Sequence, residues 1–282
     1  MDSQKKYPRH FSCEFFPPKT EAGAANLVTV QAQLERINPD FFSVTFGAGG
    51  STRDKTMEAV VAIQRSGRQA APHLSCVAST KGSIRQVLRS YQEQGIAKIV
   101  ALRGDMPSGV LSAGEFRYAN ELVEFIRAET GDHFEIHVAA YPEVHPQARN
   151  GQDDLINFKR KVDAGANTAI TQYFYTAEAY FSFVDDCEKQ GIDLPIIPGI
   201  MPINNYTQLS RFSEMCGAEI PRWLRKRLET FGDDRASIQA LGIEVVSELC
   251  QRLLDHGAPG LHFYTMNQSA PTLRIFDNLH SD

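Results

Sequence analysis

Short apolar runs recur along this chain at intervals that fit one strand followed by one helix. Each of the eight runs ends at or near a polar or charged residue; the runs are His10–Pro17, Asp40–Ala48, Ala71–Val77, Lys98–Asp105, Glu135–Pro142, Thr168–Tyr175, Pro195–Pro202 and Gly260–Asn267. The segments between them show helical periodicity, as at Ile84, Val87, Leu88 and Tyr91, which would bury one stripe of a helix. Eight strand–helix alternations predict an α/β protein with a single (β/α)8 TIM barrel domain over residues 1–282.

The interval between the seventh and eighth runs is about twice as long as the others. Pro221 stands where a first-turn proline opens a helix, and Gly232 would close that helix. The apolar spacing from Ile238 to Leu249 indicates a later helix. We therefore expect an extra helix over the barrel mouth, between strands seven and eight.

A doubly wound parallel sheet has the same order of elements and is the structural alternative. Such a sheet would normally carry a glycine-rich nucleotide fingerprint after an early strand. The nearest segment is Gly47–Thr52 (GAGGST), where Thr52 takes the place of the last glycine of G-x-G-x-x-G. The segment fits a flexible βα loop and equally fits a loop that lies against a phosphate or a cofactor.

Length, charge and cysteine content restrict the class of protein. A chain of 282 residues is long enough for one barrel and too short for a barrel with a sizeable second domain. The apolar runs have strand length and the N-terminus is polar, so we expect neither a membrane span nor a secretory signal. The formal charge of -5 gives no basic surface for nucleic acid. Five scattered cysteines without a CxxC pair favour reduced thiols, and hence the cytoplasm.

Polar side chains stand where the predicted strands end, which is where barrels of this kind place their chemistry. These residues are Glu14, Thr45, His73, Arg103, Asp105, Tyr141, Gln172 and Asn267. Glu14 lies between Cys13 and Phe15, and an apolar setting raises the pKa of a carboxyl group toward the range of a general acid. A strand-end glutamate that simply points to water is the alternative.

Two other strand ends offer contacts for a planar ligand. Arg103 and Asp105 point the same way on an extended segment, and Gly104 between them allows close approach. An ion pair between neighbouring strand tips would explain the same residues. The amide of Gln172 donates and accepts, which suits the edge of a heterocycle such as a pterin or flavin. Phe212, taken alone, is most simply a core residue.

The segment after the fifth strand carries a histidine and a polar helix face. His145 lies between prolines and is either solvated or catalytic. Asp154, Asn157 and Lys161 share one face of the next helix, which is either an ordinary solvated face or a contact for a phosphate or ribose. The histidines of the chain have no spacing that would bind a metal, so we predict no metal site.

Nine ordered motifs, which span nearly the whole chain, resemble those of the methylenetetrahydrofolate reductases. They are Glu14–Pro18 (EFFPP), Val44–Ala48 (VTFGA), Ala71–Leu74 (APHL), Leu102–Asp105 (LRGD), Ala140–Glu143 (AYPE), Lys159–Asn167 (KRKVDAGAN), Thr171–Phe174 (TQYF), Ile197–Ile200 (IPGI) and His262–Thr265 (HFYT). The resemblance implies a barrel enzyme of the bacterial type, with FAD as its cofactor. Its reaction would be reduction of 5,10-methylenetetrahydrofolate to 5-methyltetrahydrofolate by NADH or NADPH, in one-carbon metabolism and methionine synthesis. We also expect a homo-oligomer.

The resemblance also implies roles for individual residues. Glu14 corresponds to the general acid, and Asp105 to an aspartate near the flavin and the pterin. The positions that correspond to the flavin site are Thr45, Phe46, Ala48, His73, Arg103, Gly104, Asp105, Ala119, Tyr141, His145, Ala148, Asp154, Asn157, Arg160 and Lys161. The positions that correspond to the substrate site are Glu14, Thr45, Asp105, Gln172, Gln208, Phe212 and Gln268. The sequence departs from the family in two places: Phe46 replaces a common tyrosine, and Gln268 stands where relatives often carry arginine.

The implied mechanism is a ping-pong hydride relay. Reduced nicotinamide would pass a hydride to the flavin and leave, and the folate would then bind over the same flavin face. Glu14 would protonate N10 of the folate, and hydride would reach the exocyclic carbon of the resulting 5-iminium cation. Two other functions would suit a barrel: an aldolase or lyase for a phosphorylated substrate, which needs no flavin, and a non-catalytic protein that binds folate or flavin.

Overall fold

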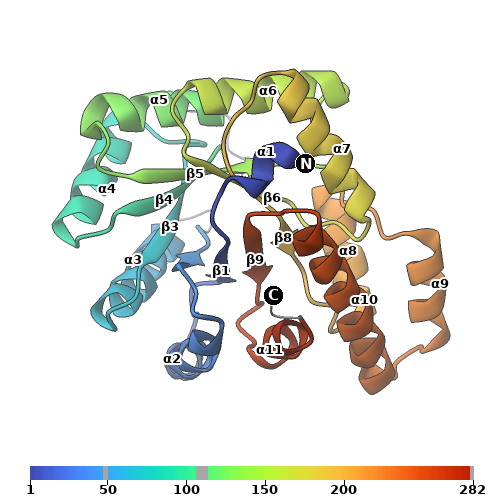
Figure 1. Cartoon of the computed structure of the whole chain (residues 1–282). Helices are drawn as coiled ribbons and strands as arrows, with labels where there is room; N and C mark the ends of the chain where they lie inside the picture. The colour runs from blue at the N-terminus through green and yellow to red at the C-terminus, as the bar shows by residue number, and fades with distance from the viewer. Residues whose placement is uncertain (47–49, 106–113, 280–282) are drawn as a thin grey trace.

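The structure is a computed structural model that describes residues 1–46, 50–105 and 114–279. Strands lie at the centre and helices surround them (Figure 1). The strands are β1 (His10–Phe15), β2 (Phe41–Val44), β3 (Ala70–Ser75), β4 (Lys98–Leu102), β5 (Glu135–Ala140), β6 (Thr168–Thr171), β7 (Ile196–Ile197), β8 (Gly199–Ile200) and β9 (Gly260–Tyr264). The helices are α1 (Asp2–Lys5), α2 (Glu21–Leu34), α3 (Gly50–Arg65), α4 (Lys81–Glu93), α5 (Ala119–Thr130), α6 (Gly151–Asp163), α7 (Ala177–Lys189), α8 (Tyr206–Cys216), α9 (Arg222–Thr230), α10 (Arg235–Asp255) and α11 (Ala270–Asp277), with a 3₁₀ turn, η1, at Glu35–Ile37.

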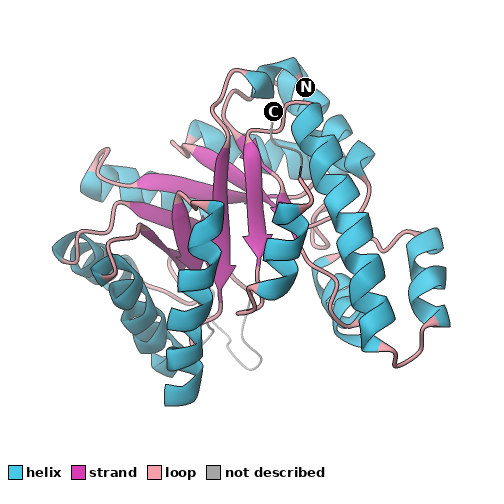
Figure 2. Ribbon diagram, turned by 60° about the horizontal axis from the view of Figure 1, so that its bottom comes forward, coloured by secondary structure: helices cyan, strands magenta, loops and turns pink. Residues whose placement is uncertain are grey.

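The strands form one parallel sheet in the order β7-β6-β5-β4-β3-β2-β1-β9-β8. Consecutive strands are neighbours from β1 to β7, and β9 returns to pair with β1. Helices cover the outside of the sheet (Figure 2). This arrangement confirms the predicted (β/α)8 barrel and excludes the doubly wound sheet, because a doubly wound sheet does not bring its last strand beside its first.

The seventh strand is divided in two at Pro198, which the apolar run Pro195–Pro202 did not reveal. Proline has no N–H, so the strand cannot continue an unbroken ladder through it. β7 pairs with β6 and β8 pairs with β9, and the Pro198 carbonyl accepts a hydrogen bond from His262 N at 3.0 Å. Gly199 is required beside it, because a Cβ there would lie 2.1 Å from the Thr171 carbonyl oxygen. The two halves of the divided strand therefore connect β6 to β9, and this pairing closes the barrel.

The interval before β9 carries two helices, α8 and α9, in addition to the long barrel helix α10. The sequence predicted one, from Pro221, and that one is α9, with Pro221 as its N-cap residue. α9 lies at the outer edge of the molecule, beyond α10, so its predicted position over the barrel mouth is wrong (Figure 1). α8 begins after Asn205, whose side chain accepts from Gln208 N at 2.8 Å, and ends at Gly217 with a left-handed φ of 77°.

Two sets of apolar side chains stabilise the barrel. The larger set packs between the strands and the helices, and Phe15 and Phe42 stack there with ring centroids 5.2 Å apart. The smaller set lies separately and consists of Phe41, Ala71, Val100 and Ile170, with Leu102 packed against it. The predicted helical stripes are confirmed, since Ile84, Leu88 and Tyr91 of α4 are buried, as are Ile238, Leu241, Val245 and Leu249 of α10.

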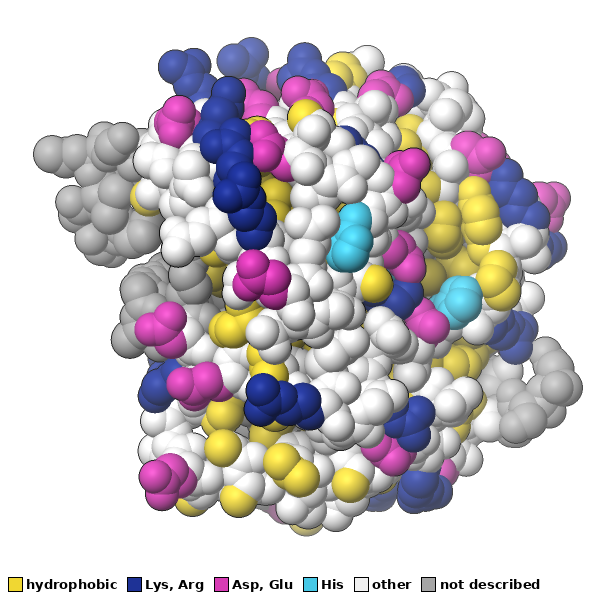
Figure 3. Space-filling view, turned by 90° about the vertical axis from the view of Figure 1, so that its left-hand side faces the viewer, with side chains coloured by type: hydrophobic (Ala, Val, Ile, Leu, Met, Phe, Trp, Pro, Cys, Tyr) yellow, Lys and Arg dark blue, Asp and Glu magenta, His cyan; other side chains and the backbone are white. Residues whose placement is uncertain are grey.

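The outer surface on the side of α3 and α4 carries basic and acidic side chains interspersed (Figure 3). Arg85 of α4, for example, pairs with Glu129 of α5 at 2.6 Å. Within the described ranges, none of the helices has the length and apolar character needed to cross a membrane. Most of the polar side chains predicted to form a site lie instead inside the barrel and at its mouth.

The short helix α1 lies against the start of β7 through one buried amide. Gln4 Nε2 donates to the Leu194 carbonyl at 3.2 Å, and Gln4 Oε1 accepts from Ile196 N at 2.8 Å. Gln4 is 1% exposed, so its loss would leave a buried donor and a buried acceptor without partners.

We expect Gln4→Ala to destabilise the protein by about 2–6 kcal/mol, because two buried groups lose their partners and each costs about 1–3 kcal/mol. Urea unfolding of the purified variant measures this free energy. Lys5→Ala is the control, because its exposed pair with Asp2 is worth only about 0–1 kcal/mol. A change below about 0.5 kcal/mol for Gln4→Ala would show that α1 does not hold β7 in place.

Candidate active site

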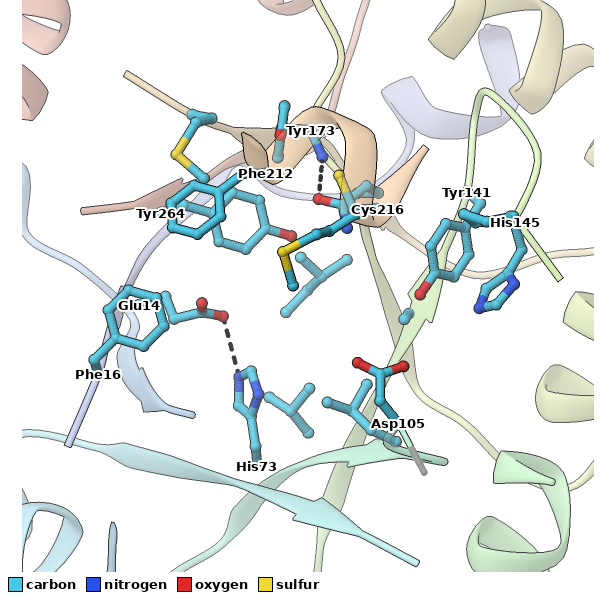
Figure 4. A pocket seen from close by; sticks show the side chains of 18 of the residues that line it. Glu14, Phe16, His73, Asp105, Tyr141, His145, Tyr173, Phe212, Cys216 and Tyr264 are labelled. Atoms are coloured by element: carbon cyan, nitrogen blue, oxygen red, sulfur yellow. Dashed lines mark hydrogen bonds and ion pairs between the residues drawn. The ribbon is translucent and has the colours of Figure 1, made fainter. Parts of the chain in front are cut away.

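A cavity of about 490 Å³ opens at the C-terminal ends of the strands, under α8. Its floor and walls include the apolar side chains of Val100, Leu102 and Ile170. The side chains predicted from the sequence that line it are Glu14, His73, Asp105, Tyr141, His145, Gln172 and Phe212. We call it the mouth cavity. Figure 4 shows Glu14 and Phe16 on one side, and Asp105, Tyr141 and His145 on the opposite side.

Glu14, at the end of β1, contacts two histidines from other strands. Its Oε2 lies 3.1 Å from His73 Nε2 and 3.6 Å from His262 Nε2. Burial by itself would raise the pKa of Glu14, but the two imidazoles outweigh burial and lower this pKa to about 2. The expectation of a raised pKa, based on the apolar neighbours in sequence, is therefore wrong for this arrangement. Those neighbours alternate outward along the strand, whereas the carboxylate points to imidazoles.

His262 is held in place from the other side of its ring. The Ser12 hydroxyl lies 2.7 Å from His262 Nδ1, and both residues are buried. Ser12 and Glu14 are two apart on β1, so both side chains face the barrel interior. The sequence analysis missed His262 as a site residue. The alternation of His262 and Tyr264 along β9 could have revealed it.

Asp105 and Tyr141 face Glu14 across the mouth cavity (Figure 4). Burial, and then the carboxylates of Asp105 and Asp154, raise the pKa of Tyr141 to about 12, so the phenol keeps its proton and can donate a hydrogen bond. The Arg103 guanidinium donates to the Gln147 side chain and to the Gly104 carbonyl. Asp105 itself is exposed toward the cavity.

Gly104 is needed for packing between strand ends. Its φ is +82°, and a Cβ there would lie 1.8 Å from Ser75 Oγ. Ser75 Oγ donates to the Arg103 carbonyl at 2.8 Å, so the end of β4 lies directly against β3. The glycine was predicted to allow a ligand to approach. The contact that requires it is with the neighbouring strand.

Gln172 and Phe212 lie on the remaining walls. Gln172 Oε1 accepts from Tyr173 N at 3.0 Å, which leaves the NH2 group as the part of the amide able to reach a ligand. Phe212 is half-buried on α8 and lines the mouth cavity together with Tyr264 and Phe16 (Figure 4). It is therefore neither a fully buried core residue nor a free surface side chain.

A second cavity of about 290 Å³, which we call the side groove, shares its boundary with the mouth cavity. Leu102, Asp105, Tyr141, His145 and Gln147 line both. The predicted cofactor residues along the side groove are Arg103, Gly104, Asp105, Ala119, Tyr141, His145, Ala148, Asp154, Asn157 and Lys161. The two cavities together form one cleft with an apolar end and a polar end.

The polar end is organised by α6, from Asp154 in its first turn to Lys161 in its last. Asp154 Oδ2 accepts from His145 N at 2.8 Å, which fixes the loop before the helix. Lys161 donates to the Ala139 carbonyl at the end of β5. Burial lowers the pKa of Lys161 to about 8, and Asp154 opposes that shift. An ammonium has three donors, so Lys161 can also bind an anionic or hydroxyl group in the side groove.

Several predicted residues line neither cavity. Thr45, Phe46, Arg160, Gln208 and Gln268 are outside both linings. Thr45 N bonds the Phe15 carbonyl beside the mouth, and Arg160 donates to Asn157 Oδ1. Gln208 and Gln268 are exposed. Ala48 lies outside the described residues.

Other residues of the cleft were not predicted as site residues from the sequence. They are chiefly Phe16, Tyr118, Asn120, Gln147, Met201, Met215, Cys216, Tyr264 and Met266. Most belong to loops or to α8, whose position over the barrel depends on tertiary packing. Over the described ranges, no group of three or more His, Cys, Asp or Glu side chains could hold a metal ion.

Comparison with known proteins identifies one family over nearly the whole chain. The family model "Methylenetetrahydrofolate reductase" matches residues 2–280. The 5,10-methylenetetrahydrofolate reductase of Escherichia coli K12 is 42% identical over 269 residues, which cover 95% of this chain and 90% of that protein. "Methylenetetrahydrofolate reductase (NADH) 1" of Arabidopsis thaliana is 40% identical over 283 residues, covering 95% of this chain and 48% of that longer protein.

A solved structure supports the fold. It is an uncharacterised protein from Clostridium thermocellum, described as binding two copies of 5-methyl-5,6,7,8-tetrahydrofolic acid. It superposes with a TM-score of 0.68 and 19% sequence identity, over 98% of each chain. At that identity the likeness shows a shared barrel.

The lowered pKa of Glu14 predicts a defined dependence of stability on pH. The charged carboxylate contributes fully above its ordinary pKa of 4.5, and this contribution is lost as the pH falls toward 2. We expect the free energy of unfolding of the wild type, minus that of Glu14→Gln, to fall by up to about 3 kcal/mol between pH 5 and pH 2. Chemical denaturation at each pH measures both values. A difference that stays constant over this range would mean that the histidines do not stabilise the Glu14 charge.

Proposed function

This chain belongs to the methylenetetrahydrofolate reductase family, and we propose that it reduces 5,10-methylenetetrahydrofolate to 5-methyltetrahydrofolate with FAD as cofactor and NADH or NADPH as hydride donor. One observation carries the proposal: Glu14 with its histidines faces Asp105 across an apolar cavity that continues into a polar groove. An acid on one side and a carboxylate on the other suit a reaction that needs a proton and passes through a cation. The five cysteines are free thiols, which favours a cytoplasmic location.

The cleft fits a long cofactor with a planar ring at one end and charged groups at the other. Arg103, Asp154, Asn157 and Lys161 offer the donors and acceptors that ribose hydroxyls and phosphates need, and they lie together in the side groove. The mouth cavity offers apolar surface for a ring system. The chemistry that a bound FAD supplies there is hydride exchange, first with the reduced nicotinamide and then with the folate.

Glu14 is proposed to give a proton to N10 of the folate. In the cluster as it stands, the lowered pKa of Glu14 leaves its carboxyl group ionised. A carboxylate beside an imidazolium and a carboxylic acid beside a neutral imidazole differ only in where one proton sits. When ligands cover the mouth and exclude water, the neutral pair gains relative to the charged pair, because a dry site penalises charge. Substrate binding would therefore raise the pKa of Glu14, so that its carboxyl group carries a proton that it can donate.

Asp105, Gln172 and Phe212 are proposed to position and stabilise the folate. The Asp105 carboxylate would stabilise the 5-iminium cation through its negative charge. The Gln172 NH2 group would donate to an acceptor on the edge of the pterin. Phe212 would stack on the folate and the nicotinamide in turn, since both must use the same wall of the cavity.

The first test is the cofactor itself. The purified protein should be yellow, and heat should release FAD, because Lys161 and its neighbours favour a ligand with two phosphates. Chromatography of the released flavin measures its identity. Lys161→Met should retain less FAD than Lys159→Met, whose lysine pairs with Asp163 instead of facing the side groove. FMN, or no flavin at all, would contradict the proposal, and the absence of any flavin would favour an aldolase or lyase.

A second prediction separates the two interpretations of Phe212. Phe212→Ala should raise KM for both substrates and leave the unfolding midpoint nearly unchanged, because the ring is only half-buried. Phe158→Ala is the matched control, since that ring is 2% exposed and its loss should cost about 3–5 kcal/mol. Steady-state kinetics and thermal unfolding provide the two readouts. If Phe212→Ala lost as much stability as Phe158→Ala with KM unchanged, Phe212 would be a core residue.

The third prediction concerns Glu14. Glu14→Gln keeps the size of the side chain but removes the acidic proton. Flavin reduction by NADH or NADPH should therefore proceed normally, while reoxidation by methylenetetrahydrofolate should slow by about 10²–10⁴-fold or more. Rapid mixing of each half-reaction measures the two rates. Glu21→Gln, at the exposed start of α2, should change neither. An unchanged folate half-reaction in Glu14→Gln would remove Glu14 from the mechanism.

A further inference from the structure

A third cavity, of about 220 Å³, lies at the opposite, N-terminal end of the barrel. We call it the base cavity. It is lined by side chains from β1, β5 and β6 and from the starts of β2 and β4, which include Ser12, Asp40, Lys98, Glu135, His137 and Thr168. Its polar character is unusual, because a barrel interior is normally filled by apolar side chains.

Charged groups surround the base cavity and bring water to its rim. Lys98 Nζ pairs with Asp40 Oδ2 at 3.3 Å and also pairs with Glu135. His10 Nδ1 lies 3.8 Å from Asp40 Oδ1. The side chains of Asp40 and Glu135 are 37% and 39% exposed, so bulk solvent reaches them. The rim can therefore exchange protons with water.

His137 indicates that the base cavity itself holds water. Its side chain is 3% exposed, and neither ring nitrogen has a hydrogen-bond partner among the described residues, although Nε2 lies 3.5 Å from Glu135 Oε1. Burial, and then the charge of Lys98, lowers the pKa of His137 to about 3, so the ring is neutral. A neutral imidazole needs one donor and one acceptor. The cavity has room for several waters at about 30 Å³ each, and they would supply both.

Ser12 connects this cavity to the active site. It lines the base cavity, and its hydroxyl contacts His262 Nδ1 at 2.7 Å. His262 Nε2 in turn lies 3.6 Å from Glu14 Oε2, and Glu14 lines the mouth cavity. His73 and Tyr264 are the other polar groups around Glu14. One polar path thus crosses the barrel from its base to its mouth.

We propose that the base cavity is hydrated and that it supplies protons to Glu14 through Ser12 and His262. The proposal rests on the proposed function, in which each turnover consumes one proton at Glu14. FAD and folate would cover Glu14 from the mouth when the acid is used. An entrance for protons at the base of the barrel would let Glu14 be reprotonated while ligands cover the mouth.

The total number of protons is conserved in this transfer. A cavity water gives a proton to Ser12 Oγ as the Ser12 hydroxyl proton passes to His262 Nδ1. The proton on His262 Nε2 passes to Glu14, so one N–H bond breaks and one O–H bond forms. One proton enters from the cavity and one reaches the carboxylate. When the product has left and the mouth is open, water there gives a proton to His262 Nε2 and Nδ1 returns its proton through Ser12 to the cavity, which restores the starting tautomer.

The first experiment needs no activity. A high-resolution crystal structure of the wild-type protein should show ordered water in the base cavity, within hydrogen-bond distance of Ser12 Oγ and of a His137 ring nitrogen. A dry cavity would overturn the proposal. If water is present but the protein does not reduce methylenetetrahydrofolate, the proposed function fails and hydration of the cavity stands.

The second experiment interrupts the path. Ser12→Ala should slow the folate half-reaction by about 10- to 100-fold, a part of the 10²–10⁴ that a positioned acid supplies, and should leave flavin reduction unchanged. The solvent deuterium isotope effect should rise, because proton delivery becomes limiting. Ser43→Ala is the matched control: that serine is buried on β2, opposite Glu14 in register, with no hydrogen-bond partner for its hydroxyl among the described residues.

A variant at the far end separates proton supply from local packing. His137→Phe removes the polar ring that needs water and should keep the fold, since no protein group among the described residues loses a hydrogen-bond partner. We expect a folate half-reaction slowed several-fold with a raised isotope effect and an unchanged unfolding midpoint. If Ser12→Ala and His137→Phe both stay within twofold of wild type with unchanged isotope effects, protons reach Glu14 by another route.

Discussion

The contact between the Glu14 carboxylate and two imidazoles is the interaction on which the site depends. A buried carboxylate is costly unless it is paired, and His73 and His262 provide that pairing from two other strands. Their attraction outweighs burial in setting the Glu14 pKa. The same contact places a carboxylate and two imidazoles, groups that can exchange protons, beside the cavity.

The barrel makes this arrangement possible because its strands end on one rim. Residues far apart in the chain, such as Glu14 on β1 and Asp105 after β4, face each other without contacting. The divided seventh strand closes the ring, and α8 covers part of the mouth. Apolar walls near Glu14 and polar groups near Lys161 then divide one cleft into two chemical environments. A ligand with a planar ring at one end and a charged tail at the other needs such a division.

Much of this was predictable from the sequence, because strand alternation and strand-end polarity are local signals. The barrel, the α4 and α10 stripes and the convergence of Glu14, His73 and Asp105 all follow from them. The direction of the Glu14 pKa shift was not predictable, since it depends on His262, which is distant in sequence. The break at Pro198 and the place of α8 depend on packing across the barrel. The roles of all the site residues, Thr45, Gln208 and Gln268 among them, remain predictions.

The central claim is that one cleft serves two separate half-reactions in turn. Anaerobic absorbance of the wild-type protein tests it most directly. NADH or NADPH alone should bleach the flavin completely, and methylenetetrahydrofolate added afterwards should restore the colour while an equal amount of 5-methyltetrahydrofolate forms. Bleaching that requires folate to be present, or reduced flavin that methylenetetrahydrofolate cannot reoxidise, would contradict the account.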